Sequence, residues 1–94
     1  MDTVASGVRT VVLDLRDVPA MDATGLVSLD SAVRGLVRRG IQVILGGVQP
    51  QPLRVLERAG WASEEGKLVI CAHFDDAVAL ARLLVPLGAP PAPA

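Results

Sequence analysis

The segment Asp22-Ala23-Thr24-Gly25 is the part of this sequence best suited to binding chemistry. It brings a carboxylate, a hydroxyl and a glycine together at the start of a stretch with helical periodicity. The first N–H groups of a helix lack intrahelical partners and lie at the positive end of the helix dipole. The turn can therefore receive an anion, a nucleotide phosphate or a partner's carboxylate, while Asp22 can also satisfy these donors itself as a helix cap. The sequence leaves both roles open.

Other acidic residues precede this turn, but their surroundings do not favour a metal site. Asp14 and Asp17 lie upstream of Asp22, which is reminiscent of the acidic pocket of a magnesium-dependent receiver domain. Asp14, however, is expected in the middle of a strand, and the single lysine, Lys67, precedes the third predicted strand instead of following it. We therefore expect exposed or capping roles for these carboxylates and no bound metal.

The remaining reactive side chains are isolated from one another along the chain. His73 is the single histidine and Cys71 the single cysteine, which excludes an internal disulfide and a zinc site based on cysteine. Cys71 belongs to the apolar run from Leu68 to Ala72, where a thiol behaves as a small hydrophobic group. No serine has a histidine nearby in the sequence to activate it. We expect a binding module without catalytic residues or a cofactor, and not an enzyme.

The composition indicates one small domain without a strong charge bias. The 94 residues are 51% hydrophobic and carry a net charge of -1, which suffices for a core and argues against nucleic acid as a partner. The longest apolar stretch, 77–87, is interrupted by Arg82 and Pro86, so we expect no insertion into a membrane. No signal-peptide pattern is present at the start, which favours a cytosolic location.

Apolar residues alternate along the chain between strand-like and helix-like spacing. The pattern predicts strands over 8–15, 41–45 and 68–72. It predicts helices from a cap at Asp22 to a terminating Gly40, over 51–59, and from a cap at Asp75 or Asp76 to about Val85. Strands and helices that alternate with short loops predict an α/β fold with a mainly parallel sheet.

The two faces of the predicted sheet differ in polarity. One face is apolar, whereas the other combines Val12 and Ile44 with the polar side chains of Asp14 and Gln42. A doubly covered sheet would be apolar on both faces, so we expect the helices mostly on one face. The domain should cover 1–88, followed by a disordered Pro/Ala-rich tail over 89–94.

Several segments between Val11 and Trp61 resemble a STAS domain, and in particular the C-terminal cytosolic domain of SulP-type anion permeases. The matching segments are Val12 to Pro19, Met21 to Leu26, Arg39 to Ile41, Gly47 to Pro52 and Val55 to Gly60. The resemblance implies a βα superhelix with a regulatory role at the inner face of the cell membrane. It implies as partners the transmembrane domain of a parent sulfate-like transporter, other cytosolic proteins or a second copy of the chain. The functional turn of the family corresponds to Asp22, Ala23, Thr24 and Gly25.

The sequence departs from the related anti-sigma-factor antagonists at this turn. In those proteins a serine that accepts phosphate occupies the position of Ala23, which has no hydroxyl. Thr24 retains a hydroxyl one residue later, and we interpret it as a first-turn residue that bonds the backbone rather than as a phosphorylation site. A freestanding antagonist-like regulator remains the alternative function.

The start of the chain also departs from the STAS pattern. STAS domains usually carry a pair of strands and a helix before the strand that is expected here from Val8, and the segment Met1 to Gly7 is too short to supply them. We therefore expect the first strand and the face with Val12 and Ile44 to be uncovered, and to promote self-association or docking of another segment.

Overall fold

Within residues 9–84, three strands and three helices alternate, which confirms the predicted α/β fold. The computed structural model describes residues 9–84, so the predicted tail over 89–94 and the segment Met1 to Gly7 lie outside the described residues. The elements are β1 (Thr10–Asp14), α1 (Ala23–Arg38), β2 (Gln42–Gly46), α2 (Pro50–Arg58), β3 (Leu68–Cys71) and α3 (Phe74–Leu83).

The strands form a parallel sheet in the order β1-β2-β3. Val12 of β1 pairs with Ile44 of β2, which in turn pairs with Val69 of β3. In the central strand β2 the side chains of Val43, Ile44 and Leu45 are fully buried. Because all strands run in the same direction, their carboxyl ends and the loops that follow them meet at one edge of the sheet.

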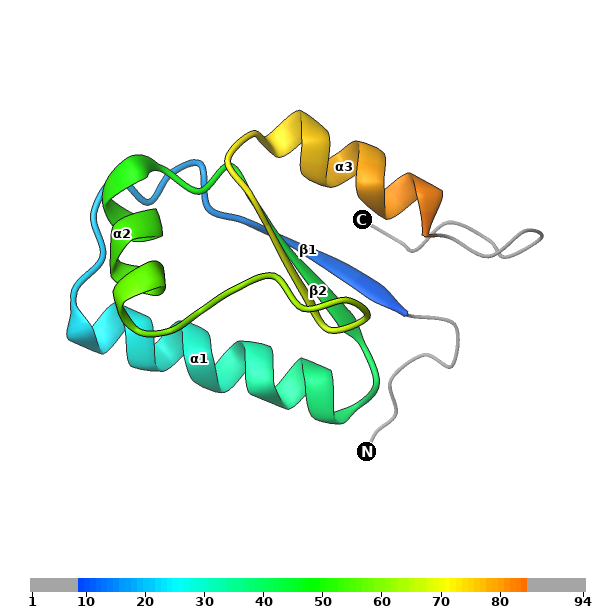
Figure 1. Ribbon diagram of the computed structural model, residues 1–94, viewed down its shortest axis with the longest axis horizontal. Helices are drawn as coiled ribbons and strands as arrows, with labels where there is room; N and C mark the ends of the chain where they lie inside the picture. The colour runs from blue at the N-terminus through cyan, green and yellow to red at the C-terminus, as the bar shows by residue number, and fades with distance from the viewer. Residues whose placement is uncertain (1–8, 85–94) are drawn as a thin grey trace.

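Helices cover both faces of the sheet in the structure. Helices α1 and α2 lie together on one face, and α3 lies alone on the other (Figure 1). The core on the first face contains Val33 of α1 and Leu56 of α2 against β2. Two of the three helices thus share a face, as predicted.

The expectation that the second face is uncovered is wrong at its centre. Ile44 is 0% exposed, and Ala77 of α3 is equally buried. Helix α3 can approach β2 closely because Gly46 has no side chain. A Cβ at this position would lie 2.9 Å from Ala77 Cβ and 3.0 Å from the ring of Phe74. Helix α3 therefore supplies the cover that we expected to be missing.

The ends of the helices follow from local chemistry. After α1, Gly40 adopts a φ of +78°, its N–H donates to Val37 O, and the N–H of Ile41 donates to Leu36 O. These bonds satisfy carbonyls at the end of the helix, as predicted from Gly40. Helix α3 differs from its prediction, because its N-cap is His73. Asp75 and Asp76 follow in its first turn, where negative charge favours the positive helix end.

The outer edge of β3 is closed by the loop that precedes it. The carbonyls of Lys67 and Cys71 accept hydrogen bonds from Val43 N and Val48 N, so the odd-numbered residues of this segment bond toward β2. The backbone groups of the even-numbered residues, Leu68 and Ile70, therefore point away from β2. The N–H and C=O of Leu68 both bond to Glu64, and the N–H of Ile70 donates to Ser63 Oγ at 3.1 Å. On the other side, β1 pairs with no other described strand than β2.

Candidate functional site

The turn at Asp22–Gly25 opens helix α1 with the predicted cap. Asp22 Oδ1 accepts a hydrogen bond from the N–H of Gly25 at 2.8 Å, and the first helical bond runs from Leu26 N to Asp22 O. Ala23 and Thr24 are both exposed. A Cβ at position 25 would lie 3.3 Å from Asp22 Oδ1, so glycine leaves room for the capping carboxylate. The turn is thus an ordered helix start with two accessible residues.

An apolar hollow of about 500 Å³ lies beside this turn. It is bounded by the loop between β1 and α1 and by the first two turns of α1. Its lining is Leu15, Val18, Ala20, Met21, Asp22, Gly25 and Leu29. Because apolar side chains dominate the lining, the hollow suits an apolar group of a ligand or partner that also touches the exposed turn.

Two glutamine side chains hold the loop that leads into the turn. Gln51 Oε1 accepts from the N–H of Met21 at 2.7 Å, and Gln51 Nε2 donates to Met21 O at 3.2 Å. Gln49 Nε2 donates to Arg16 O at 2.7 Å. Figure 1 shows the start of α2 next to the loop that runs from β1 into α1. Gln49 and Gln51 belong to the segment Gly47 to Pro52 that carries part of the STAS resemblance, but this role was not predicted from the sequence.

Arg16 joins the end of β1 to the start of α3. Its guanidinium bonds both carboxylate oxygens of Asp14, at 3.0 and 2.8 Å, and lies 3.7 Å from the centre of the Phe74 ring. The hydrogen bonds from Arg16 hold the pKa of the Asp14 carboxyl below its usual value. The predicted mid-strand position of Asp14 is wrong, because it is the last residue of β1. Its carboxylate is engaged by Arg16 rather than held free for a cation.

The other side chains considered for chemistry are dispersed. Cys71 is partly buried in β3, and this burial raises the pKa of its thiol. His73 is exposed at the start of α3. Within residues 9–84, no group of three His, Cys, Asp or Glu side chains is placed to hold a metal ion.

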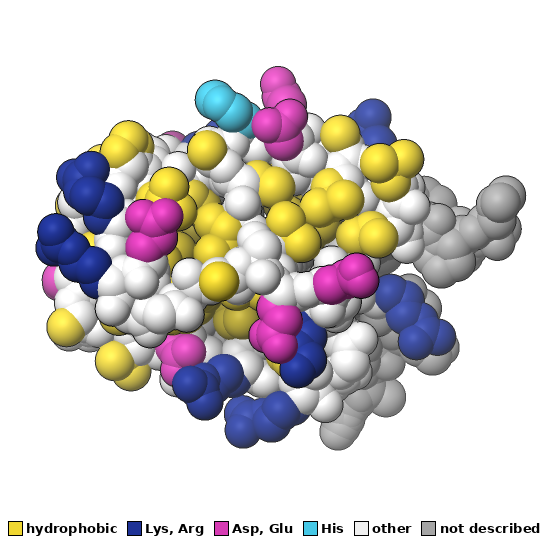
Figure 2. All heavy atoms as spheres, viewed as in Figure 1, with side chains coloured by type: hydrophobic (Ala, Val, Ile, Leu, Met, Phe, Trp, Pro, Cys, Tyr) yellow, Lys and Arg dark blue, Asp and Glu magenta, His cyan; other side chains and the backbone are white. Residues whose placement is uncertain are grey.

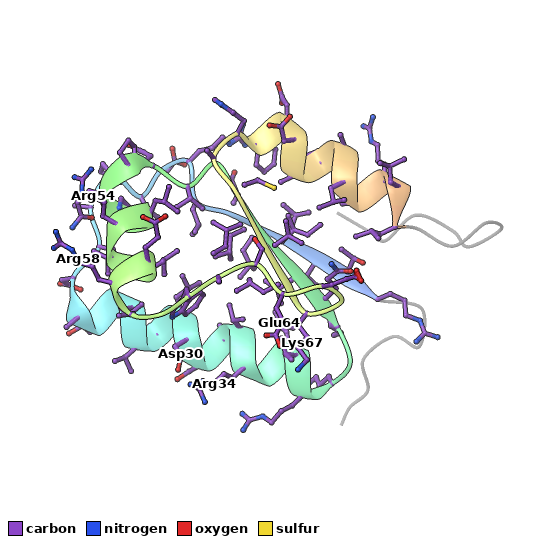
Figure 3. All side chains as sticks on the ribbon, viewed as in Figure 1. Asp30, Arg34, Arg54, Arg58, Glu64 and Lys67 are labelled. Carbon is purple, nitrogen blue, oxygen red and sulfur yellow. The ribbon has the colours of Figure 1, made fainter. Side chains whose placement is uncertain are left out.

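Two ion pairs link charged side chains that are close in sequence, away from the turn. Asp30 and Arg34 on α1 form an ion pair at 2.9 Å, and Lys67 lies 3.4 Å from Glu64 in the loop before β3. Figure 3 shows Arg54 projecting outward from α2, away from the sheet. Figure 2 shows hydrophobic side chains gathered on the face toward the viewer, below the histidine. On the face seen in Figure 2, acidic and basic side chains are interspersed.

Replacing the cap tests the turn directly. Asp22→Ala removes the acceptor of the Gly25 N–H, so we expect the free energy of unfolding to fall by about 1 kcal/mol. Asp22→Asn retains an acceptor oxygen and should lose much less. Urea titration of the three proteins measures both values, and equal stability of the alanine variant and the wild type would contradict the capping role.

No described helix combines the length and the apolar character needed to cross a membrane. The sequence profile of the STAS domain family matches residues 1–79, which is more than half of the chain. Searches of curated proteins and of solved structures gave no match. The profile match agrees with the parallel sheet, the alternating helices and the resemblance read from the sequence, and the chain therefore belongs to the STAS domain family.

Proposed function

We propose that this chain is the cytosolic regulatory domain of a SulP-type anion transporter and that it acts by docking through the turn Asp22–Gly25. The observation that carries the proposal is the form of this turn. It is a capped and exposed helix start, held by glutamines from α2, with alanine where the antagonist branch carries its phosphorylated serine. The proposal gives the turn a docking role and no catalytic one.

The surroundings of the turn support docking. Thr24 and Ala23 are exposed next to the apolar hollow, so a partner can contact the helix start and bury an apolar side chain in one approach. An ordered site loses little conformational entropy when it binds, which favours affinity. The segment 49–52, which supplies the glutamines, is also the segment whose sequence most resembles the permease branch.

The proposed partner is the transmembrane domain of the parent transporter, at the inner face of the cell membrane. Other cytosolic proteins or a second copy of the chain are further partners in this proposal. The net charge of -1 and the locally paired ions argue for protein contacts rather than nucleic acid.

A freestanding antagonist-like regulator is the alternative, and Thr24 is the residue that favours it. Its hydroxyl is exposed beside the position of the missing serine. Incubation with a serine kinase of the sigma-factor pathway, followed by mass spectrometry, separates the two functions. Stoichiometric phosphate on Thr24 would support the regulator, and an unmodified chain would support the transporter domain.

Binding to the detergent-solubilised membrane domain of the transporter encoded with this chain tests the docking role. Thr24→Arg places a long charged side chain at the turn without touching the core, so we expect at least about tenfold weaker binding by titration calorimetry. Ala79→Arg, the same charge placed at another exposed residue, on α3, is the matched control and should bind as the wild type does. Failure of the wild type to bind, or equal binding of all three proteins, would contradict the proposal.

A further inference from the structure

We infer that Gln51, assisted by Gln49, is a positioning residue that fixes the docking turn from helix α2. Gln51 bonds both backbone groups of Met21, the residue immediately before the cap Asp22. Gln49 bonds the carbonyl of Arg16 at the other end of the same loop. The loop is therefore held at both ends by side chains that are 30 and 33 residues away in sequence.

The prolines in this segment explain why the Gln49 side chain is not needed to cap α2 and can bond the loop instead. An N-cap residue normally uses its side chain to satisfy the free N–H groups of its own helix. Gln49 is the N-cap of α2, yet its side chain makes no capping bond. Pro50 and Pro52 have no N–H, which removes two of the free donors at the helix start; one of them, at Pro52, is a donor that a cap side chain would bond. Helix α2 can thus begin without a capping side chain, and the amide of Gln49 reaches across to the loop instead.

The contact at Met21 has a specific geometry. The amide of Gln51 accepts from the N–H and donates to the C=O of the same residue, so both atoms of the side-chain amide must be correctly oriented. Met21 also lines the apolar hollow. The single side chain of Gln51 consequently fixes one wall of the hollow and the entry into the capped helix, and a docking partner meets α2 and the turn as one unit.

Amide hydrogen exchange followed by NMR tests this inference without a partner. The N–H of Met21 donates to Gln51 Oε1, so Gln51→Leu should accelerate its exchange roughly tenfold. Gln51→Glu keeps an acceptor for this N–H and should restore most of the protection. Gln42→Leu is the matched control, because Gln42 is a half-buried glutamine at the opposite end of β2 from the turn.

Each outcome bears on the inference. Faster exchange of Met21 in Gln51→Leu, with protection in Gln51→Glu and Gln42→Leu, supports the positioning role. Equal exchange in Gln51→Leu and the wild type overturns it, and so does an equal acceleration in Gln42→Leu, which would indicate general loosening. The inference rests on the proposed function only in calling Asp22–Gly25 a docking turn. The positioning role of Gln51 and the docking role of the turn can therefore fail separately. A wild type that does not bind the membrane domain would refute the docking role and leave the exchange result intact.

Discussion

Leu56→Ala is expected to lower the free energy of unfolding by about 2–5 kcal/mol. Leu56 is fully buried on α2 and belongs to the core cluster with Val33 and Val43. A cavity there costs the lost burial of the side chain and the lost contacts of its neighbours. Domains are stable by only about 5–15 kcal/mol, so the change removes a large share of the total. Urea denaturation monitored by circular dichroism measures it.

Leu53→Ala is the matched control on the same helix. Leu53 is only partly buried at the margin of the core, so the same chemical change should cost clearly less. Equal losses at positions 53 and 56 would contradict the described packing of α2.

Gly46→Val is expected to destabilise the domain by about 3 kcal/mol, at the upper end of the usual range for overpacking. Even a Cβ at this position would lie 2.9 Å from Ala77 Cβ, closer than real side chains come, and 3.0 Å from the Phe74 ring. The added methyl groups must therefore push α3 away from the sheet. Displacement of Phe74 would also disturb its contact with Arg16. Denaturant titration gives the energy, and NMR shifts of the α3 amides locate the movement.

Gly35→Ala provides the opposite control. Gly35 lies inside α1, and a Cβ there would meet no atom within 4 Å. Alanine is the better helix former, so this variant should be more stable by about 0.5–1 kcal/mol. A stabilising effect of Gly46→Val, or no difference between the two variants, would refute the close approach of α3.

The order of elements and the start of α1 could be predicted because their signals are local. Asp22 and Gly40 delimit a helix whose apolar residues recur at spacings of three and four, and both act at the predicted places. The strands are short apolar runs between turn residues; β1 and β3 lie within their predicted bounds, and β2 extends one residue beyond, to Gly46. These features depend on neighbours a few residues away.

The cover of the second face could not be predicted from polarity alone. The polar residues on that face are at the strand ends: Gln42 is the first residue of β2, and Asp14 is the last of β1. Between them Ile44 is buried under α3. The decisive feature is the missing side chain of Gly46, whose effect appears only when α3 is placed against it.

The glutamine contacts were missed for a different reason. Periodicity and capping rules describe interactions within an element, whereas Gln51 bonds a backbone 30 residues away. The visible signal was the pair of prolines at 50 and 52, which leaves a helix start with fewer donors than a cap normally serves. A helix start with few donors indicates that the side chain of its N-cap residue, Gln49, is free to bond outside its own helix.

The hydrogen bonds along the outer edge of β3 protect that side of the sheet from pairing with a further strand. An open strand edge is a template for another strand, and the bonds to Ser63 and Glu64 occupy that template on one side. A strand donated by another polypeptide therefore finds most of the outward backbone groups of β3 already bonded. Growth of the sheet by an added strand is thus hindered at β3, which protects this side of the domain from the edge-to-edge pairing that leads to aggregation.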